Sequence, residues 1–402
     1  MSPLAVIDYT LVTALGVGRG ATLDSLLQSR SGLARRDFET ASLDTWLGVV
    51  DGLDSLPWSA ALADFDCRNN RLAERALRSD GFDRAVQACV QRHGARRVGV
   101  FLGTSTSGIL QTEIAYRERD ASSGALPAGL RYAETHNSYS VAAYVRAALG
   151  LRGPAFVVST ACSSSAKVFG SAARLIQAGM IDAAVVGGVD SLCMTTLYGF
   201  KSLELLSTRP CSPWDAQRSG LSIGEGAAFA LLEKDASRSG KNSVNGPAAW
   251  LLGVGESSDA HHMSSPHPEG LGAALAMQAA LADAHLDAGA VGYLNLHGTG
   301  TGNNDAAEDA AVCQVFGRDL PCSSTKGFTG HTLGAAGGVE AAIAMLALQH
   351  GLMPAGLNLQ HPDPALHANF LRQTLHRPLS VAASNSFGFG GTNCCLVFGA
   401  AK

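Results

Sequence analysis

The chain has 402 residues, of which 46% are hydrophobic and 16% are charged. This length and apolar content suffice for a large buried core, built as two domains or as one duplicated domain. The net charge of −4 and the lack of any run of about 18 apolar residues argue against a nucleic-acid partner and against a membrane partner.

The cysteines and the N-terminus indicate a compartment. The nine cysteines are odd in number and include no C-x-x-C pair, a pattern that does not favour a disulfide framework or a zinc site. Residues 1–18 show neither the basic segment nor the cleavage site of a secretory signal. We therefore expect a cytoplasmic protein with reduced thiols.

Short apolar runs alternate with alanine-rich stretches along the chain. They predict strands at 98–102, 155–158, 183–186, 227–232 and 291–296, and helices at 164–178, 272–284 and 338–350. Strands that are apolar throughout are typical of sheets covered on both faces, so we expect a layered α/β architecture. The polar segment 233–246 divides the chain into residues 1–235 and 236–402, two pieces that fit a duplicated fold.

Cys162 stands where an apolar strand ends and a helix begins, in the stretch VVSTACSSSAKVFG of residues 157–170. The ordinary role of a cysteine is that of a small buried hydrophobe. At the start of a helix, however, unpaired N–H groups and the helix dipole favour the thiolate, which is the nucleophilic form. Cys162 is therefore a candidate nucleophile that needs partners.

Two glycine-framed segments supply candidate partners. LNLHGTGTGNND, residues 294–305, places His297 after a predicted strand, and SSTKGFTGHTLGAAGG, residues 323–338, contains Lys326 and His331. The glycines after His297 resemble a dinucleotide loop, but the fingerprint is incomplete and a histidine heads it. Two histidines in such turns, with a lysine and a cysteine, indicate a catalytic group.

A fourth stretch, SNSFGFGGTN at residues 384–393, interleaves glycines with Phe387 and Phe389. Glycines let backbone N–H groups approach a ligand closely, as an oxyanion hole requires. Taken alone, the same stretch also fits a tight turn that packs aromatic rings into the core.

Together these stretches resemble the elongating β-ketoacyl-acyl-carrier-protein synthases, within the thiolase-like condensing enzymes. The resemblance extends over nearly the whole chain and includes RPCSPWDAQRSGLSIGEGAA at residues 209–228. It implies a thiolase-like α/β fold of two duplicated βαβαβ halves in α/β/α/β/α layers. The half of residues 1–235 would carry the nucleophile, and the half of residues 236–402 would carry both histidines and the gating loop.

The resemblance also assigns roles to individual residues. It implies that Cys162 accepts the acyl chain, that His297 and His331 are catalytic, and that Lys326 pairs with Glu340. The backbone N–H groups of Cys162 and Phe389 would form the oxyanion hole, with Phe389 as a gate. The remaining assignments are the phosphopantetheine contacts Thr299, Thr301 and Ser264, the acyl-pocket residues Thr106 and Phe387, and the structural acids Asp305 and Glu308.

The implied reaction is a decarboxylative condensation of a cysteine-bound acyl chain with malonyl-acyl carrier protein. A thiolate divides one difficult carbon–carbon bond formation into two easier steps. Two histidine N–H groups stabilise the enolate left by loss of carbon dioxide. This chemistry requires no metal or redox cofactor beyond the phosphopantetheine arm of the carrier.

Three departures leave the substrate open. Ser163, Ser164 and Ser165 follow the nucleophile where relatives more often have alanine, threonine or glycine, glycines occupy the HGTGTGNND loop, and the segment between residues 209 and 213 is short. Thr106 is polar and β-branched at a position that limits pocket depth in relatives. This favours a polyketide or polyene chain over a saturated fatty acid.

Partners follow from the same resemblance. Acyl carrier proteins are acidic, so we expect a basic docking surface. Its candidates are Arg209 and a helical stripe of Arg68, Arg71, Arg75 and Arg78, although a solvated face balanced by Asp64, Asp66 and Glu74 explains the stripe equally well. The resemblance further implies a two-fold dimer, with an identical chain or a homologous subunit, in which residues 130–140 face the partner's pocket.

Two other functions remain as alternatives. A catalytically silent subunit that sets chain length would not need Cys162, His297, Lys326 and His331. A cysteine hydrolase would need a cysteine–histidine pair open to water, which the paired histidines and the gate do not favour.

Overall fold

The computed structural model describes residues 1–234 and 246–401. One large sheet runs through the protein in the order β12-β11-β15-β16-β10-β1-β9-β7-β5-β6. The first half of the chain contributes β1 (Leu4–Thr13), β5 (Val98–Gly103), β6 (Ala155–Val158), β7 (Ala183–Asp190) and β9 (Gly226–Glu233). The second half contributes β10 (Ala249–Ser258), β11 (Tyr293–Asn295), β12 (Cys322–Ser323), β15 (Val381–Gly388) and β16 (Thr392–Ala400).

The strand order repeats between the halves. Counted outward from the central pair β1 and β10, each half places its first, fifth, fourth, second and third strand. The halves join where residues 4–6 of β1 pair antiparallel with residues 249–251 of β10. This repeat confirms the predicted duplication, while the predicted boundary at residues 235 and 236 falls on the segment 235–245, outside the described residues.

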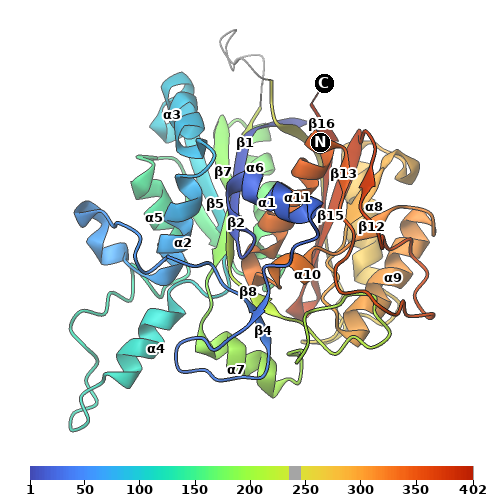
Figure 1. Ribbon diagram of the computed structural model, residues 1–402. Helices are drawn as coiled ribbons and strands as arrows, with labels where there is room; N and C mark the ends of the chain where they lie inside the picture. The colour runs from blue at the N-terminus through green and yellow to red at the C-terminus, as the bar shows by residue number, and fades with distance from the viewer. Residues whose placement is uncertain (235–245, 402) are drawn as a thin grey trace.

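Helices form the other layers (Figure 1). Helices α6 (Ser164–Gln177) and α11 (Ala336–His350) contact strands of both halves and form the central layer. On one outer face lie α2 (Arg68–Leu77), α3 (Phe82–His93) and α5 (Ser140–Ala148), and on the other lie α8 (Leu271–Ala284) and α9 (Gly302–Phe316). The layers therefore follow the α/β/α/β/α order that the sequence predicts.

Apolar strands and helices explain why the central layer is buried. Every residue of β7 and β9 is buried, as expected for strands covered on both faces. All residues of α11 from Ala336 to Leu348 are buried as well. A Cβ added at Gly337 of α11 would lie 2.7 Å from the Cβ of Ala166, so the two central helices cross at a distance that only glycine permits there.

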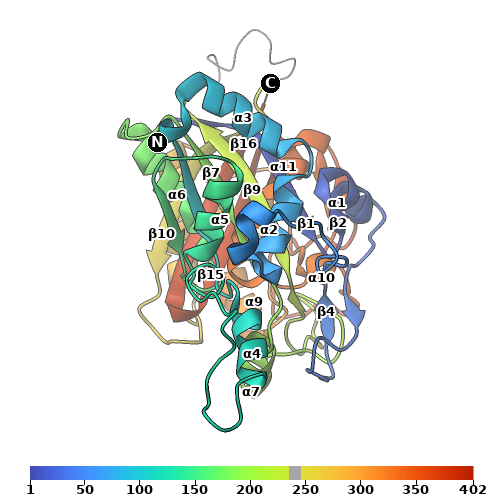
Figure 2. The ribbon, with the colours of Figure 1, turned by 90° about the vertical axis from the view of Figure 1, so that its left-hand side faces the viewer.

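Smaller elements surround this core. Helix α1 (Gly18–Leu27) packs on β1, and the short strands β4 (Trp46–Gly48) and β8 (Ile223–Gly224) pair beside the large sheet. Helix α4 (Ile109–Arg117) and the loop after it extend away from the body, next to α7 (Met194–Ser202) (Figure 2). Among the described residues, no helix has both the length and the apolar character to cross a bilayer.

Candidate active site

Cys162 lies in the turn between β6 and α6, as the sequence predicts, and its side chain is buried. The preceding residue, Ala161, has a positive φ of 52°, a conformation that is uncommon outside glycine. The Ser164 hydroxyl donates to the Ala161 carbonyl at 2.6 Å and accepts the Thr160 N–H at 2.9 Å. These bonds hold the strained turn that directs Cys162 into the site.

The serines that follow the nucleophile therefore have a structural explanation. Ser163 Oγ lies 2.7 Å from Thr392 Oγ1, which links the turn to β16, and Ser165 Oγ accepts the Gly338 N–H at 2.8 Å. The turn packs tightly on β5 and β7, because a Cβ at Gly103 would lie 2.3 Å from the Ser165 nitrogen and one at Gly188 would lie 2.6 Å from the Ser165 Cβ. The serine run thus satisfies polar groups where two buried helices meet.

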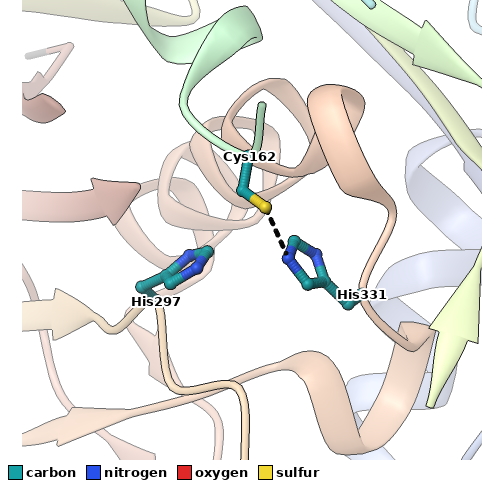
Figure 3. Close-up of side chains that lie close together, drawn as sticks. All are labelled: Cys162, His297 and His331. Atoms are coloured by element: carbon teal, nitrogen blue, oxygen red, sulfur yellow. Dashed lines mark hydrogen bonds between the residues drawn. The ribbon is translucent and has the colours of Figure 1, made fainter. Parts of the chain in front are cut away.

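His331 reaches the nucleophile directly, with Nε2 at 3.0 Å from Cys162 Sγ (Figure 3). On the other side of the ring, Nδ1 accepts the backbone N–H of Leu333 at 3.3 Å. A neutral imidazole has one donor and one acceptor nitrogen. The proton therefore resides on Nε2, and His331 directs an N–H donor at the sulfur.

His297 has the same arrangement. Its Nδ1 lies 3.3 Å from Lys326 Nζ, an ammonium that can only donate, so the ring proton is again on Nε2. The rings of His297 and His331 are 5.3 Å apart and nearly perpendicular. Burial and the charge of Lys326 lower the pKa of both histidines well below the usual value, so both are neutral donors at neutral pH.

Lys326 is fully enclosed and forms an ion pair with Glu340 of α11, while also donating to the His297 carbonyl. Burial raises the pKa of Glu340 to about 7, and the charge of Lys326 opposes that shift. The predicted pairing of these two residues is thus present. Since Lys326 contacts His297 and not Cys162, it orients a histidine.

The electrostatics at Cys162 differ from the sequence expectation of a favoured thiolate. Burial raises the pKa of Cys162 to about 12, against the opposing effects of the Lys326 charge and a hydrogen bond from the Phe389 backbone N–H. Burial therefore favours the protonated thiol over the thiolate.

The loop after His297 is held by two buried acids. Glu308 of α9 accepts the N–H groups of His297 and Gly298 at 2.8 and 2.7 Å. Asp305 accepts the N–H groups of Gly300 and Trp214. Burial raises the pKa of Glu308 to about 7 and that of Asp305 to about 6. These contacts fit the structural role that the resemblance assigns to both acids.

A cavity of about 210 Å³ opens onto the three central side chains. Its wall includes every residue expected to contact the phosphopantetheine arm, together with the aromatic pair of the glycine-rich turn: Ser264, Thr299, Thr301, Phe387 and Phe389. Phe389 lies against Phe200 of α7, with ring centres 5.9 Å apart. One cavity thus joins segments that lie more than 200 residues apart in the sequence.

Thr106 does not line this cavity. It is buried, and both its backbone N–H and its hydroxyl donate to Asp190 Oδ1 at 2.8 Å. Its polar side chain is therefore explained by a hydrogen bond inside the protein. Its predicted role in an acyl pocket stays a prediction.

Asp190 is a site residue that sequence reasoning missed. This carboxylate is the last residue of β7 and is completely buried. It also accepts the Thr104 hydroxyl at 2.6 Å and the N–H groups of Ser105 and Gly334. Gly334 lies three residues after His331, so Asp190 connects the histidine turn to the turn after β5. An acid that ends the apolar run AAVVGGVD was the available signal.

The predicted basic stripe is wrong for Arg68. Its side chain is only 7% exposed and forms a bidentate ion pair with buried Glu225, with nitrogen–oxygen distances of 2.6 and 2.9 Å. Arg71 pairs with Asp66 and donates to backbone carbonyls of the preceding loop. Both guanidinium groups hold the structure together, so Arg68 is excluded as a docking residue and Arg71 has little free capacity.

The other docking candidates differ in exposure. Arg75 is half-buried and Arg78 pairs with Glu74 and Asp83. Arg209 is exposed and donates to Gln217. A docking role therefore stays a prediction for Arg75 and Arg209.

Comparison with known sequences places this site in context. Residues 1–237 match the family "Beta-ketoacyl synthase, N-terminal domain", and residues 248–360 match "Beta-ketoacyl synthase, C-terminal domain". The chain is 33% identical to 3-oxoacyl-[acyl-carrier-protein] synthase 2 of Vibrio harveyi over 419 residues, which covers 96% of this chain and 97% of that protein. It is 36% identical to nodulation protein E of Rhizobium meliloti over 311 residues, 76% of each chain.

Solved structures agree with the sequence matches. A chain of the complex between the ketosynthase ApeO and its chain length factor ApeC from Xenorhabdus doucetiae superposes with a TM-score of 0.88 at 36% identity, covering 100% of this chain and 98% of that one. A β-ketoacyl synthase from Burkholderia phymatum STM815 gives a TM-score of 0.89 at 30% identity, with both chains fully covered.

Proposed function

Because this chain belongs to the β-ketoacyl synthase family of condensing acyltransferases, we propose that it is a catalytically active, elongating ketosynthase. It joins an acyl chain carried on Cys162 to malonyl-acyl carrier protein. The observation that carries this proposal is the complete group of Cys162, His297 and His331 at one cavity, with Lys326 bonded behind His297. A subunit that only shapes its partner's pocket has no use for this group.

In the first step, the Cys162 sulfur attacks the thioester carbonyl of the acyl carrier protein. The new carbon–sulfur bond forms as the carrier's sulfur leaves and takes up the proton that the Cys162 thiol loses. The negative oxygen of the tetrahedral intermediate is stabilised by the backbone N–H groups of Cys162 and Phe389. The N–H of Phe389 already reaches the thiol in the resting site.

In the second step, malonyl-acyl carrier protein loses carbon dioxide. The electrons of the broken carbon–carbon bond move into the thioester and form an enolate, whose oxygen accepts the Nε2–H groups of His297 and His331. Both rings are neutral, and their Nδ1 atoms are occupied, so both donors are fixed before substrate arrives. The enolate carbon then attacks the acyl carbonyl, the Cys162 thiolate leaves, and one proton from solvent restores the thiol. The chemistry needs no group beyond these residues and the carrier's arm.

Two partners complete the proposal. An acyl carrier protein delivers its arm past Ser264, Thr299 and Thr301, in a fatty-acid or polyketide-type pathway. A second ketosynthase-like subunit, identical or homologous, packs on the edge strand β6, whose Phe156 is 41% exposed and which, among the strands of the described residues, pairs with β5 alone. A relative of this chain forms such a pair with its chain length factor.

The test is intact-protein mass spectrometry after mixing with a panel of acyl-carrier thioesters. Wild type should gain one acyl group, Cys162→Ala should gain none, and Cys313→Ala, which alters a partly exposed cysteine, should behave as wild type. Addition of malonyl-acyl carrier protein should discharge the adduct and yield a 3-oxoacyl product. Failure to load any acyl group, alone or with a co-purified homologous subunit, would favour the silent-subunit alternative.

A further inference from the structure

A second group of metal-ligating side chains lies at the opposite end of the sheet from Cys162. Cys89 and His93 lie on α3, and Glu233 is the last residue of β9. Glu233 pairs with Ala183, the first residue of β7, whereas Cys162 follows the far end of the parallel strand β6. Within residues 1–234 and 246–401, this group and the catalytic one are the two that could hold an ion with three ligands.

The three candidate ligand atoms lie close together. Cys89 and His93 are four residues apart and therefore share one face of the helix. The Cys89 sulfur, a His93 ring nitrogen and a Glu233 carboxylate oxygen lie within 4.8 Å of one another, with His93 Nε2 at 2.5 Å from Glu233 Oε1. Cys89 and Glu233 are fully buried, and the His93 side chain is 10% exposed.

His93 and Glu233 also face charged side chains outside the group of three. His93 Nδ1 faces Asp182 Oδ2 at 3.9 Å, and Glu233 Oε2 accepts Arg92 Nη2 at 2.8 Å. A histidine that binds a metal commonly directs its other nitrogen at a carboxylate, and a ligating carboxylate is itself hydrogen-bonded through its second oxygen. The feature at Glu233 is present here, whereas His93 Nδ1 is beyond hydrogen-bond distance of Asp182, whose Oδ2 pairs with Arg97 at 2.7 Å. An ion held by His93 Nε2 and Glu233 Oε1 would replace the hydrogen bond that joins these two atoms at 2.5 Å.

We propose that Cys89, His93 and Glu233 bind one Zn²⁺ ion, which fastens helix α3 to the end of β9. A sulfur, an imidazole nitrogen and a carboxylate oxygen form a donor set typical of zinc, whereas calcium and magnesium take oxygen ligands. The thiolate and the carboxylate balance the two charges of the ion, and water occupies the fourth position. Binding releases the thiol proton of Cys89 to solvent. This site has no part in the condensation proposed above.

Cobalt(II) is the probe, because a thiolate bound to it gives a charge-transfer absorption band in the near ultraviolet. The titration uses chelator-treated Cys162→Ala protein, so that the catalytic group cannot contribute this band. We expect one equivalent of cobalt to produce the band and one equivalent of zinc to remove it. The same zinc should raise the melting temperature.

Variants assign the band to the site. Cys89→Ser and His93→Gln, each in the Cys162→Ala background, should abolish it, and Cys313→Ser should leave it unchanged. If Cys89→Ser does not fold, the cobalt band of His93→Gln provides the test, because the His93 side chain is more exposed. Absence of the band from the Cys162→Ala protein, or its persistence in folded His93→Gln, would overturn the proposal.

Discussion

Replacing Asp190 by asparagine should slow condensation more than it destabilises the protein. Asp190 Oδ1 accepts bonds from the turn after β5, and Oδ2 accepts the Gly334 N–H at 2.5 Å. The amide oxygen of asparagine can replace Oδ1, but its NH₂ group then faces the Gly334 N–H, donor against donor. A buried N–H without an acceptor costs about 1–3 kcal/mol, so the free energy of unfolding should fall by that amount.

The loss of condensation rate follows from the clash between the asparagine NH₂ group and the Gly334 N–H. Gly334 is three residues from His331, so the turn that carries this histidine is the part that shifts to relieve the clash. A displacement of about 1 Å in a catalytic group can cost about 100-fold in rate. We expect the condensation rate per folded enzyme to fall by about 10- to 100-fold.

The assay compares the condensation rate and the denaturant midpoint of Asp190→Asn with those of Asp309→Ala. Asp309, on α9, accepts two backbone N–H groups from residues 367 and 368, outside the cavity wall. Its loss should lower stability by a similar amount without slowing the folded enzyme. Equal rates for the two variants would refute the idea that Asp190 positions His331.

Three further predictions concern other parts of the protein. The wild-type condensation rate should be lower at one pH unit below 7 than at one unit above 7, because Glu340, with a pKa of about 7, takes up a proton and its neutral form no longer pairs with Lys326. Glu340→Gln should lower the rate at the higher pH and so reduce the ratio of the two rates. An equal ratio of the two rates in wild type and variant would contradict the assignment. Arg68→Gln should lower the free energy of unfolding by about 3–5 kcal/mol, as measured by denaturant unfolding, since it leaves Glu225 buried without its partner. An unchanged denaturant midpoint with a raised KM for acyl carrier protein would instead restore Arg68 as a docking residue. Gly337→Val should lower the melting temperature by forcing α11 away from α6, and calorimetry that finds no change would show that the helices tolerate separation.

The sequence by itself indicated the layered fold and the candidate catalytic residues. Cys162 and His297 each follow an apolar strand, and His331 lies in a glycine-rich stretch, so their local settings can be recognised without knowledge of distant residues. The predicted strand at 183–186 is real but extends to Asp190, because Gly187 adopts a φ of 143° that a glycine permits, and the pairing with β5 and β9 continues through it. Local patterns of this kind persist in the fold since they arise from backbone geometry and apolar spacing.

Only the tertiary structure decided which polar groups are buried and with whom they pair. The spacing of Arg68 and Arg71 places them on one side of a helix but cannot indicate that Glu225, far along the chain, meets Arg68 inside the protein. For the same reason Asp190 and Gly334, 144 residues apart, could not be linked from sequence. The group of Cys89, His93 and Glu233 was also hidden, because Glu233 comes from strand β9, 140 residues after His93 in the chain. The charge state of Cys162 depended on burial by several segments at once, which no local pattern records.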